Sequence, residues 1–328
     1  MSARGRVFIA VALAAIGAAG LVIAGVEVTR SDAGKGARRA GRLAGYPPVV
    51  LDLGIRTDRD AQLLRRASAL YDRGLHDRAR RLFERSDSLE GRVAAAFASW
   101  PDDSLARLER MARRHPRSAF VLLHLGLARF WAGRRGAASS AWREALRRDP
   151  DTASAVRADD LLHPNSPRGR PTFIPSFGMP PSLARLSPPQ QLRALARMAR
   201  TGGVRGKLLY GIALQRLERP ESAERQYAAA ARLAPRDAEA QVAAAVGLFS
   251  KENPTPAFSH LGPLTRRFPR ATTVRFHLAL LLYWIGQPAA AGKQLRRAVA
   301  EGPDTPLGRE AKRLLDRLER VRTDRPKK

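Results

Sequence analysis

The sequence contains no cysteine. Without thiols the chain can form no disulfide bond, use no cysteine nucleophile and offer no thiolate ligand to zinc or an iron–sulfur cluster. Aromatic residues are also scarce, at 6% of the chain, and only seven of its 59 basic residues are lysine. A lack of cysteine is compatible with either side of a membrane, so it leaves the cellular compartment open.

Alanine, leucine and arginine make up much of what is present. Hydrophobic residues are 44% of the 328 residues, which is enough to build a core and excludes wholesale disorder. The mixture favours helices, because these three residues have high helix propensity. The length allows one large domain, two modest domains or an array of repeats.

The charge is strongly unbalanced, with 59 Lys and Arg against 30 Asp and Glu and a net charge of +29. Such a surface attracts polyanions and acidic membranes. The arginines are spread along the whole chain, whereas a nucleic-acid site would concentrate them on one face. Nucleic acid is therefore not the expected partner, and binding of a polyanion or anionic surface through the arginine-rich surface stays an alternative function.

The N-terminus begins with a basic tail, residues 1–6, followed by the uncharged stretch Val7–Val26. A helix of this length spans ~30 Å, which matches the hydrocarbon core of a bilayer. We therefore predict a transmembrane anchor that makes the lipid bilayer a partner, with a cleaved signal peptide as the alternative. Residues 27–59 are predicted to be a basic Gly/Ala/Pro linker, in which Pro47-Pro48 prevents a continuous helix.

The orientation of such an anchor is contested within the sequence. Basic residues are more numerous after the apolar stretch than before it, and by the positive-inside rule this places the rest of the chain in the cytoplasm. A short tail before a single signal-like helix instead favours export of the large domain. We expect a single-pass protein of the cell membrane with an extracytoplasmic domain.

Prolines recur in the chain at intervals of 34 residues. Between them apolar residues fall at i, i+3, i+4 and i+7 in two stretches separated by a turn, which predicts pairs of amphipathic helices. In the clearest unit, 119–152, small Gly126 and Ala138 are expected where the two helices cross, with Trp142 nearby. The landmark prolines are Pro116, Pro150, Pro235, Pro269 and Pro303.

This pattern of small, large and proline positions resembles the tetratricopeptide repeat (TPR). The unit 204–237 shows it again in Leu208, Tyr210, Gly211, Ala223, Tyr227, Ala230 and Pro235. The resemblance implies an all-α, right-handed superhelical solenoid of helix–turn–helix repeats that follows the N-terminal transmembrane or signal helix. The expected segments are TPR-like repeats in 60–152, a split repeat in 153–203 with a Pro-rich insertion at 163–189, three repeats in 204–305, a capping helix at 306–321 and a basic tail at 322–328.

The sequence offers little for chemistry. It has no Gly-x-Ser-x-Gly elbow, no HExxH and no glycine-rich phosphate loop, so we expect no catalytic residue, no cofactor and no metal site. His124 and His277 occupy equivalent places in two repeats. The simpler interpretation is that the register repeats a tolerated residue, and a functional pair is the alternative.

The resemblance also implies a concave groove lined by the first helix of each repeat, which holds a peptide. We expect a membrane-tethered, non-catalytic scaffold or adaptor whose protein or peptide partner presents a hydrophobic or amphipathic segment. Alternatively, several groove side chains are buried against neighbouring repeats or by the insertion. The groove candidates are Leu123, Leu127, Phe130, Trp131, Leu208, Ile212, Gln215, Arg216, Val242, Val246, Phe249, Phe276, Leu280, Tyr283 and Trp284.

The insertion contains an apolar stretch, 172–180, flanked by arginines. Long loops of this kind are usually functional or disordered. We expect this one to lie along the solenoid, held by Phe173 and Phe177, and contact with a partner or membrane is the alternative.

Overall fold

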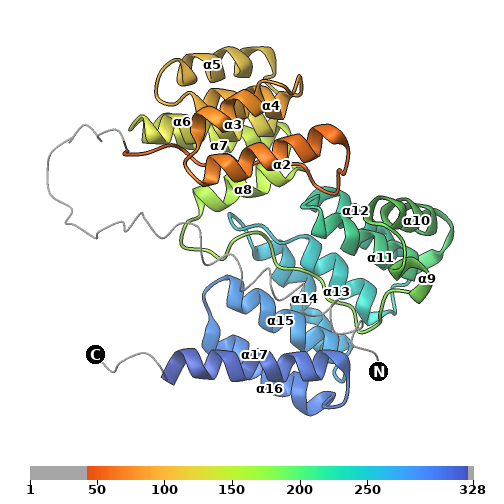
Figure 1. The fold of residues 1–328 in the computed structure, drawn as a ribbon. Helices are drawn as coiled ribbons and strands as arrows, with labels where there is room; N and C mark the ends of the chain where they lie inside the picture. Colours follow the sequence, from red (N-terminus) through yellow and green to blue (C-terminus); the bar gives the residue numbers. More distant parts are fainter. Residues whose placement is uncertain (1–42, 324–328) are drawn as a thin grey trace, which may run out of the picture. The chain divides into compact units, whose positions relative to one another are not determined.

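The computed structural model describes residues 43–323, and within this range the chain forms sixteen helices and no strand (Figure 1). The described residues divide into two compact units. We call residues 43–162 the N-terminal unit and residues 163–323 the C-terminal unit. This agrees with the predicted all-α class and with helices arranged as repeats.

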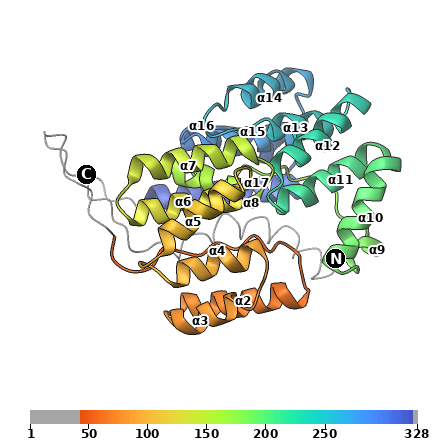
Figure 2. The same ribbon diagram turned by 90° about the horizontal axis from the view of Figure 1, so that it is seen from above.

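The N-terminal unit is built from consecutive antiparallel helix pairs. Each helix packs mainly on the next one in the chain, and the three pairs α2/α3, α4/α5 and α6/α7 are followed by α8 (Figure 2). The helices are α2 (Arg59–Asp72), α3 (His76–Phe83), α4 (Leu89–Ala98), α5 (Ser104–Arg114), α6 (Ala119–Trp131), α7 (Arg135–Arg148) and α8 (Ala153–Leu162).

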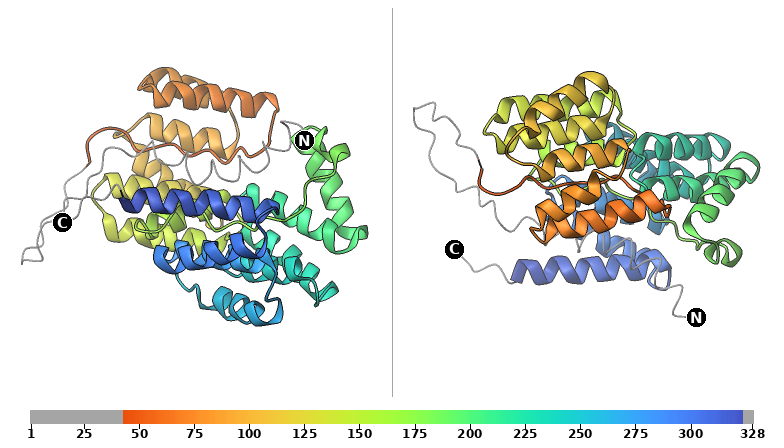
Figure 3. Two further views of the ribbon diagram at one scale, coloured as in Figure 1. Left: turned by 90° about the horizontal axis from the view of Figure 1, so that it is seen from below. Right: turned by 45° about the horizontal axis from the view of Figure 1, so that its top comes forward.

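The C-terminal unit repeats this arrangement with three helix pairs, α11/α12, α13/α14 and α15/α16. The final helix α17 lies alongside the last pair, and α10 packs on α11 (Figure 3). The helices are α9 (Pro181–Ala184), α10 (Pro188–Thr201), α11 (Gly203–Arg216), α12 (Pro220–Leu233), α13 (Ala238–Gly247), α14 (Thr255–Arg267), α15 (Thr272–Trp284), α16 (Pro288–Glu301) and α17 (Pro306–Thr323).

Local signals start these helices and turn the chain between them. Asp58, Ser118 and Asp237 each accept a hydrogen bond from a backbone N–H in the first turn of α2, α6 and α13. In the turn between α2 and α3, Gly74 has a φ of 76°, which glycine adopts without steric cost. Glu218 takes the matching place between α11 and α12 with a φ of 54°, a conformation that costs energy for a residue with a side chain.

The helices of a pair cross closely where the first helix has a glycine. A Cβ on Gly126 would overlap the indole of Trp142, and one on Gly211 would overlap the ring of Tyr227. Both aromatic side chains are buried, and Trp142 Nε1 also donates to the Leu123 carbonyl at 3.2 Å. The predicted close approach at Gly126 is confirmed.

The predicted location in a cell membrane requires correction. No helix in residues 43–323 is long and apolar enough to span a bilayer. The stretch Val7–Val26, on which the single-pass prediction depended, lies outside the described residues. We therefore withdraw the assignment to the cell membrane and the extracytoplasmic orientation that went with it.

Candidate functional site

The predicted groove residues are mostly interior. Among them Tyr283, at 38% of its surface, and Arg216 are exposed, and Phe130, Trp131 and Gln215 are half-buried. The first helices use these apolar side chains to pack on their neighbours and on extended segments of the same chain. The buried candidates are Leu123, Leu127, Leu208, Ile212, Val242, Val246, Phe249, Phe276, Leu280 and Trp284.

One extended segment, residues 170–178, runs along the first helices of the C-terminal unit. We call it the C-terminal strap, and Figure 1 shows it as part of the non-helical green segment that precedes α9. Phe173 is only 1% exposed, and its ring lies 5.6 Å from that of Tyr227 and 5.1 Å from that of His277. Phe177 is half-buried against the same core. The expectation that the insertion lies along the repeats through these two phenylalanines is confirmed.

Side chains of three successive first helices hold the strap by its main chain. Gln215 Oε1 on α11 accepts from the Phe173 N–H at 3.2 Å, and His277 Nε2 on α15 accepts from the Ile174 N–H at 2.9 Å. Glu239 on α13 accepts from the Ser176 N–H at 3.0 Å. These bonds satisfy backbone donors that have no helix or sheet partner.

The ring of His277 is fixed in one protonation state by its surroundings. Its Nδ1 lies 2.7 Å from the Thr273 carbonyl and must donate to it, which leaves Nε2 unprotonated to accept from Ile174. Burial lowers the pKa of His277 to about 4, and the bond to Thr273 opposes this shift. The imidazole is thus neutral near pH 7 and acts as a hydrogen-bond acceptor for the strap.

The N-terminal unit holds a second extended segment, residues 46–56, which we call the N-terminal strap. The Tyr71 hydroxyl on α2 donates to the Pro47 carbonyl at 2.6 Å, and the Val50 N–H donates to His124 Nε2 on α6 at 3.2 Å. Leu53 is buried in the core, while Val49 and Val50 are half-buried against it. This segment therefore also lies along first helices, and side chains of those helices hold it by hydrogen bonds to its main chain.

His124 has the same electrostatic setting as His277. Its Nδ1 lies 2.7 Å from the Phe120 carbonyl, so Nε2 is the acceptor for Val50. Burial lowers its pKa to about 4 as well, against the effect of the bond to Phe120. The two histidines therefore share a role, which corrects the simpler interpretation of a merely tolerated residue.

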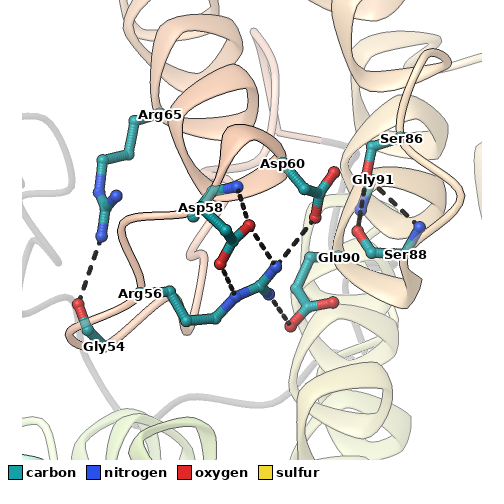
Figure 4. A network of polar contacts seen from close by, with 10 residues as sticks. Gly54, Arg56, Asp58, Asp60, Arg65, Ser86, Ser88, Glu90 and Gly91 are labelled. Atoms are coloured by element: carbon teal, nitrogen blue, oxygen red, sulfur yellow. Dashed lines mark hydrogen bonds and ion pairs between the residues drawn. The ribbon is translucent and has the colours of Figure 1, made fainter. Parts of the chain in front are cut away.

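An ionic cluster fixes the end of the N-terminal strap (Figure 4). Arg56 is bidentate to Asp58, at 3.0 and 3.1 Å, and also reaches Asp60 at 3.1 Å and Glu90 at 3.8 Å. The hydrogen bond from Arg56 holds the pKa of Asp58 well below its usual range. Arg56 is 40% exposed, so these pairs position the strap more than they stabilise it.

Sequence reasoning missed the N-terminal strap and placed its residues in a linker. Two signals could have revealed it. Pro47 and Pro171 are each followed after three residues by a β-branched aliphatic residue, Val50 or Ile174, and after seven by a glycine. The equivalent histidines provide the second signal.

A separate shallow cavity of about 180 Å³ lies on α4 and α5, away from the straps. Four guanidinium groups surround it, from Arg92, Arg107, Arg110 and Arg114, and Met111 adds an apolar wall. Among the described residues, only Arg110 of these four has a carboxylate within ion-pair distance, with Asp103 at 3.7 Å. Within the described part of the chain, no three His, Asp or Glu side chains come together as a metal site would require.

Comparisons with known proteins give fold-level similarity only. The sequence matches no protein-family model and no curated protein. Among solved structures, this chain is similar to YrrB, described as a TPR protein with an unusual peptide-binding site, at 16% identity and a TM-score of 0.30. The match covers 63% of this chain and 97% of YrrB. Yeast Tom70 gives 12% identity and a TM-score of 0.32, covering 81% of this chain and 55% of Tom70.

A third similar structure is the TPR2AB domain of yeast Sti1 in complex with an Hsp90 peptide. It has 14% identity and a TM-score of 0.29, and the match covers 79% of this chain and 98% of that one. The structural neighbours are thus TPR proteins, and the described helices form repeated pairs as TPR helices do. Similarity at this level by itself assigns neither a family nor a function.

Proposed function

We propose that this chain is a non-catalytic protein-interaction scaffold that holds an extended, apolar segment of a partner along its first helices. One observation carries the proposal: in both units, side chains of these helices hydrogen-bond the main chain of an extended segment. Main-chain bonds combined with pockets for alternate side chains are a general means of peptide recognition.

The surface offered to a partner includes the predicted residues that are not buried. Tyr283 is exposed near the end of α15, and Phe130 is half-buried on α6, the equivalent helix of the other unit. Lys251 Nζ lies 5.9 Å from the ring of Trp284, next to Tyr283. A glutamate at position 130 or 283 would oppose the docking of an apolar segment.

The proposal is tested by affinity capture with full-length protein beside a Phe130→Glu/Tyr283→Glu variant. Leu233→Glu is the matched control, because Leu233 is 58% exposed and lies on α12, a second helix. Circular dichroism first establishes that all three proteins are equally helical. We expect partners that are lost from the double variant and kept by the control, whereas identical partner sets would contradict the proposal.

A second candidate function is binding of a polyanion, and the four-arginine cavity favours it. Neutralising phosphates with arginine releases counterions, so affinity would fall steeply with salt. Arg107→Glu/Arg110→Glu should reduce the slope of log affinity against log salt by roughly 2 for duplex DNA. Arg147→Glu/Arg148→Glu on α7 is the control with the same change of charge, and equal slopes for the two variants would leave only the nonspecific attraction of a basic protein.

A further inference from the structure

The two units match one another in more than their helix order. Each has an extended strap, three helix pairs and a final helix. The residues that touch the straps fall at equivalent places. Tyr71 and Gln215 are the next-to-last residues of α2 and α11, and Glu90 and Glu239 are the second residues of α4 and α13.

The third equivalent pair is the clearest. His124 and His277 are the sixth residues of α6 and α15, the first helices of the third pair in each unit. Each accepts a main-chain N–H from the strap residue that follows a proline by three positions, Val50 or Ile174. The same hydrogen bond forms in both units although the strap side chains differ. It is therefore a property of the helix surface that binds the strap, and not of one strap sequence.

The straps also show which chemistry this surface accepts. The residues from the proline to the histidine-bonded position, Pro47–Val50 and Pro171–Ile174, carry no charge in either unit. Both stretches are extended, and in both the histidine-bonded residue is β-branched. Main chain that is even partly buried needs acceptors of this kind, because an unpaired N–H shielded from water is costly.

The two straps differ in how firmly they are held. In the C-terminal unit, three N–H groups are bonded and the Phe173 ring is fully buried between Tyr227 and His277. In the N-terminal unit, side chains of the first helices bond one N–H and two carbonyls of the strap, Leu53 is buried, and Val49 and Val50 stay half-buried. The N-terminal strap is therefore held by fewer N–H bonds and without a buried aromatic ring, so we expect it to be the more easily displaced.

We propose that the two units are copies of one peptide-holding module, and that the N-terminal strap is a built-in ligand which a partner segment replaces. That partner segment is extended and contains a proline followed three residues later by valine or isoleucine, with no charged residue between the two. The C-terminal strap is the same ligand held permanently. This inference rests on the proposed function and names the class of partner.

The test uses the full chain and a labelled synthetic peptide with the sequence of residues 46–56. Val50→Pro removes the N–H that His124 accepts and leaves every helix intact. Val49→Pro is the matched control, because the Val49 N–H donates to no acceptor among the described residues. We expect the peptide to bind the Val50→Pro protein at least tenfold more tightly than the unaltered chain or the control.

Two further variants tie this binding to the histidine. Adding His124→Ala to Val50→Pro should weaken peptide binding at least tenfold, and a peptide with proline at the Val50 position should not bind. Equal binding by the Val50→Pro and Val49→Pro proteins, or no effect of His124→Ala, would overturn the inference. Partner capture that is sensitive to Phe130 and Tyr283, in the absence of peptide binding, would overturn this inference while leaving the proposed function standing.

A second measurement needs no altered protein. Hydrogen exchange of the unaltered chain should show that excess peptide with the 46–56 sequence exposes the Val50 amide, whereas a scrambled peptide of the same composition does not. An Ile174 amide that stays protected throughout is expected from its firmer attachment. If the Val50 amide stays equally protected at saturating peptide, this would also contradict the replacement of the strap by the peptide.

Discussion

The two straps solve one binding problem with different side chains. The C-terminal strap buries a phenylalanine and is bonded at three N–H groups. The N-terminal strap buries the smaller Leu53, has half-buried valines and ends in an exposed arginine cluster. The histidine bond to the main chain is common to both. The difference shows that the histidine recognises the main chain in both units, whereas the other contacts of each strap set how firmly it is attached.

The largest difference in stability loss between the units is expected when the strap side chain that packs in the core is truncated. Phe173→Ala should destabilise the C-terminal unit by about 3–5 kcal/mol, because it leaves a cavity beside Tyr227 and His277. Val50→Ala should cost the N-terminal unit only about 1 kcal/mol, since its side chain is half-buried. Hydrogen exchange resolved by unit, during denaturant unfolding, measures both. Similar losses in the two units would break the comparison.

Phe177→Ala serves as the control within the same strap. Its ring is half-buried and lies 4.9 Å from Arg205, so we expect a smaller loss than for Phe173. A loss of stability as large as that of Phe173→Ala would mean that attachment of the strap is shared along its length and does not depend mainly on the Phe173 ring.

The helix crossings should respond alike in both units. Gly126→Ala and Gly211→Ala each force a methyl group into a buried aromatic ring, which should cost about 1–3 kcal/mol. Gly136→Ala and Gly262→Ala are the controls, because a Cβ at these helical positions meets nothing within 4 Å. Thermal unfolding followed by circular dichroism gives the values, and a neutral result at either crossing would contradict the common design.

Acidification should weaken both units to a similar extent. Both histidines have a pKa of about 4 in the folded chain, below the ordinary value of 6.5, so the unfolded state binds protons first as the pH falls. Stability is constant above about pH 6.5 and falls between there and pH 4. From pH 7 to pH 5.5 the loss should be about 1.2 kcal/mol for each unit.

The free energy of unfolding at the two pH values, obtained with denaturant, provides the measurement. His124→Gln should remove this dependence from the N-terminal unit and His277→Gln from the C-terminal unit. A slope that persists in both variants would assign it to other groups. Glu239 opposes this loss, because burial raises its pKa above the ordinary value of 4.5 and the folded state therefore binds its proton first as the pH falls.

The smallest expected change in stability comes from the turn that joins the two helices of the first pair in each unit, α2/α3 and α11/α12. Glu218 holds the left-handed conformation that Gly74 holds in the matching turn. Glu218→Gly should therefore stabilise the C-terminal unit by about 0.5–1 kcal/mol. Gly74→Ala, which introduces the same strain into the N-terminal unit, should destabilise it by a similar amount in the same thermal assay.

The repeated helix pairs were predictable because each repeat carries its own local pattern. The contact between Gly126 and Trp142 joins two helices of one repeat, and the prolines mark the repeats every 34 residues, so both can be recognised from residues close in the chain. The openness of the groove was not predictable in this way. Leu208 and Val246 are apolar whether a partner or a neighbouring helix covers them, so sequence alone does not distinguish the two.

The straps could not be found from periodicity, because an extended segment held by side chains has none. The bond between Val50 and His124 joins residues 74 positions apart, and that between Ile174 and His277 joins residues 103 apart. Pro47-Pro48 prevents a helix, as predicted, but the non-helical segment is bonded to α2 and α6 and is not a free linker. Only the fold brings the acceptor to the strap.

These separations also set an order of events during synthesis. A ribosome that adds ~5–20 residues per second needs roughly 4–15 s to make His124 after Val50, and roughly 5–20 s to make His277 after Ile174. Through that interval each strap has emerged without its acceptor. Every newly made chain therefore passes through a stage in which its apolar straps are open to other nascent segments or to chaperones, and the third helix pair of each unit ends that stage.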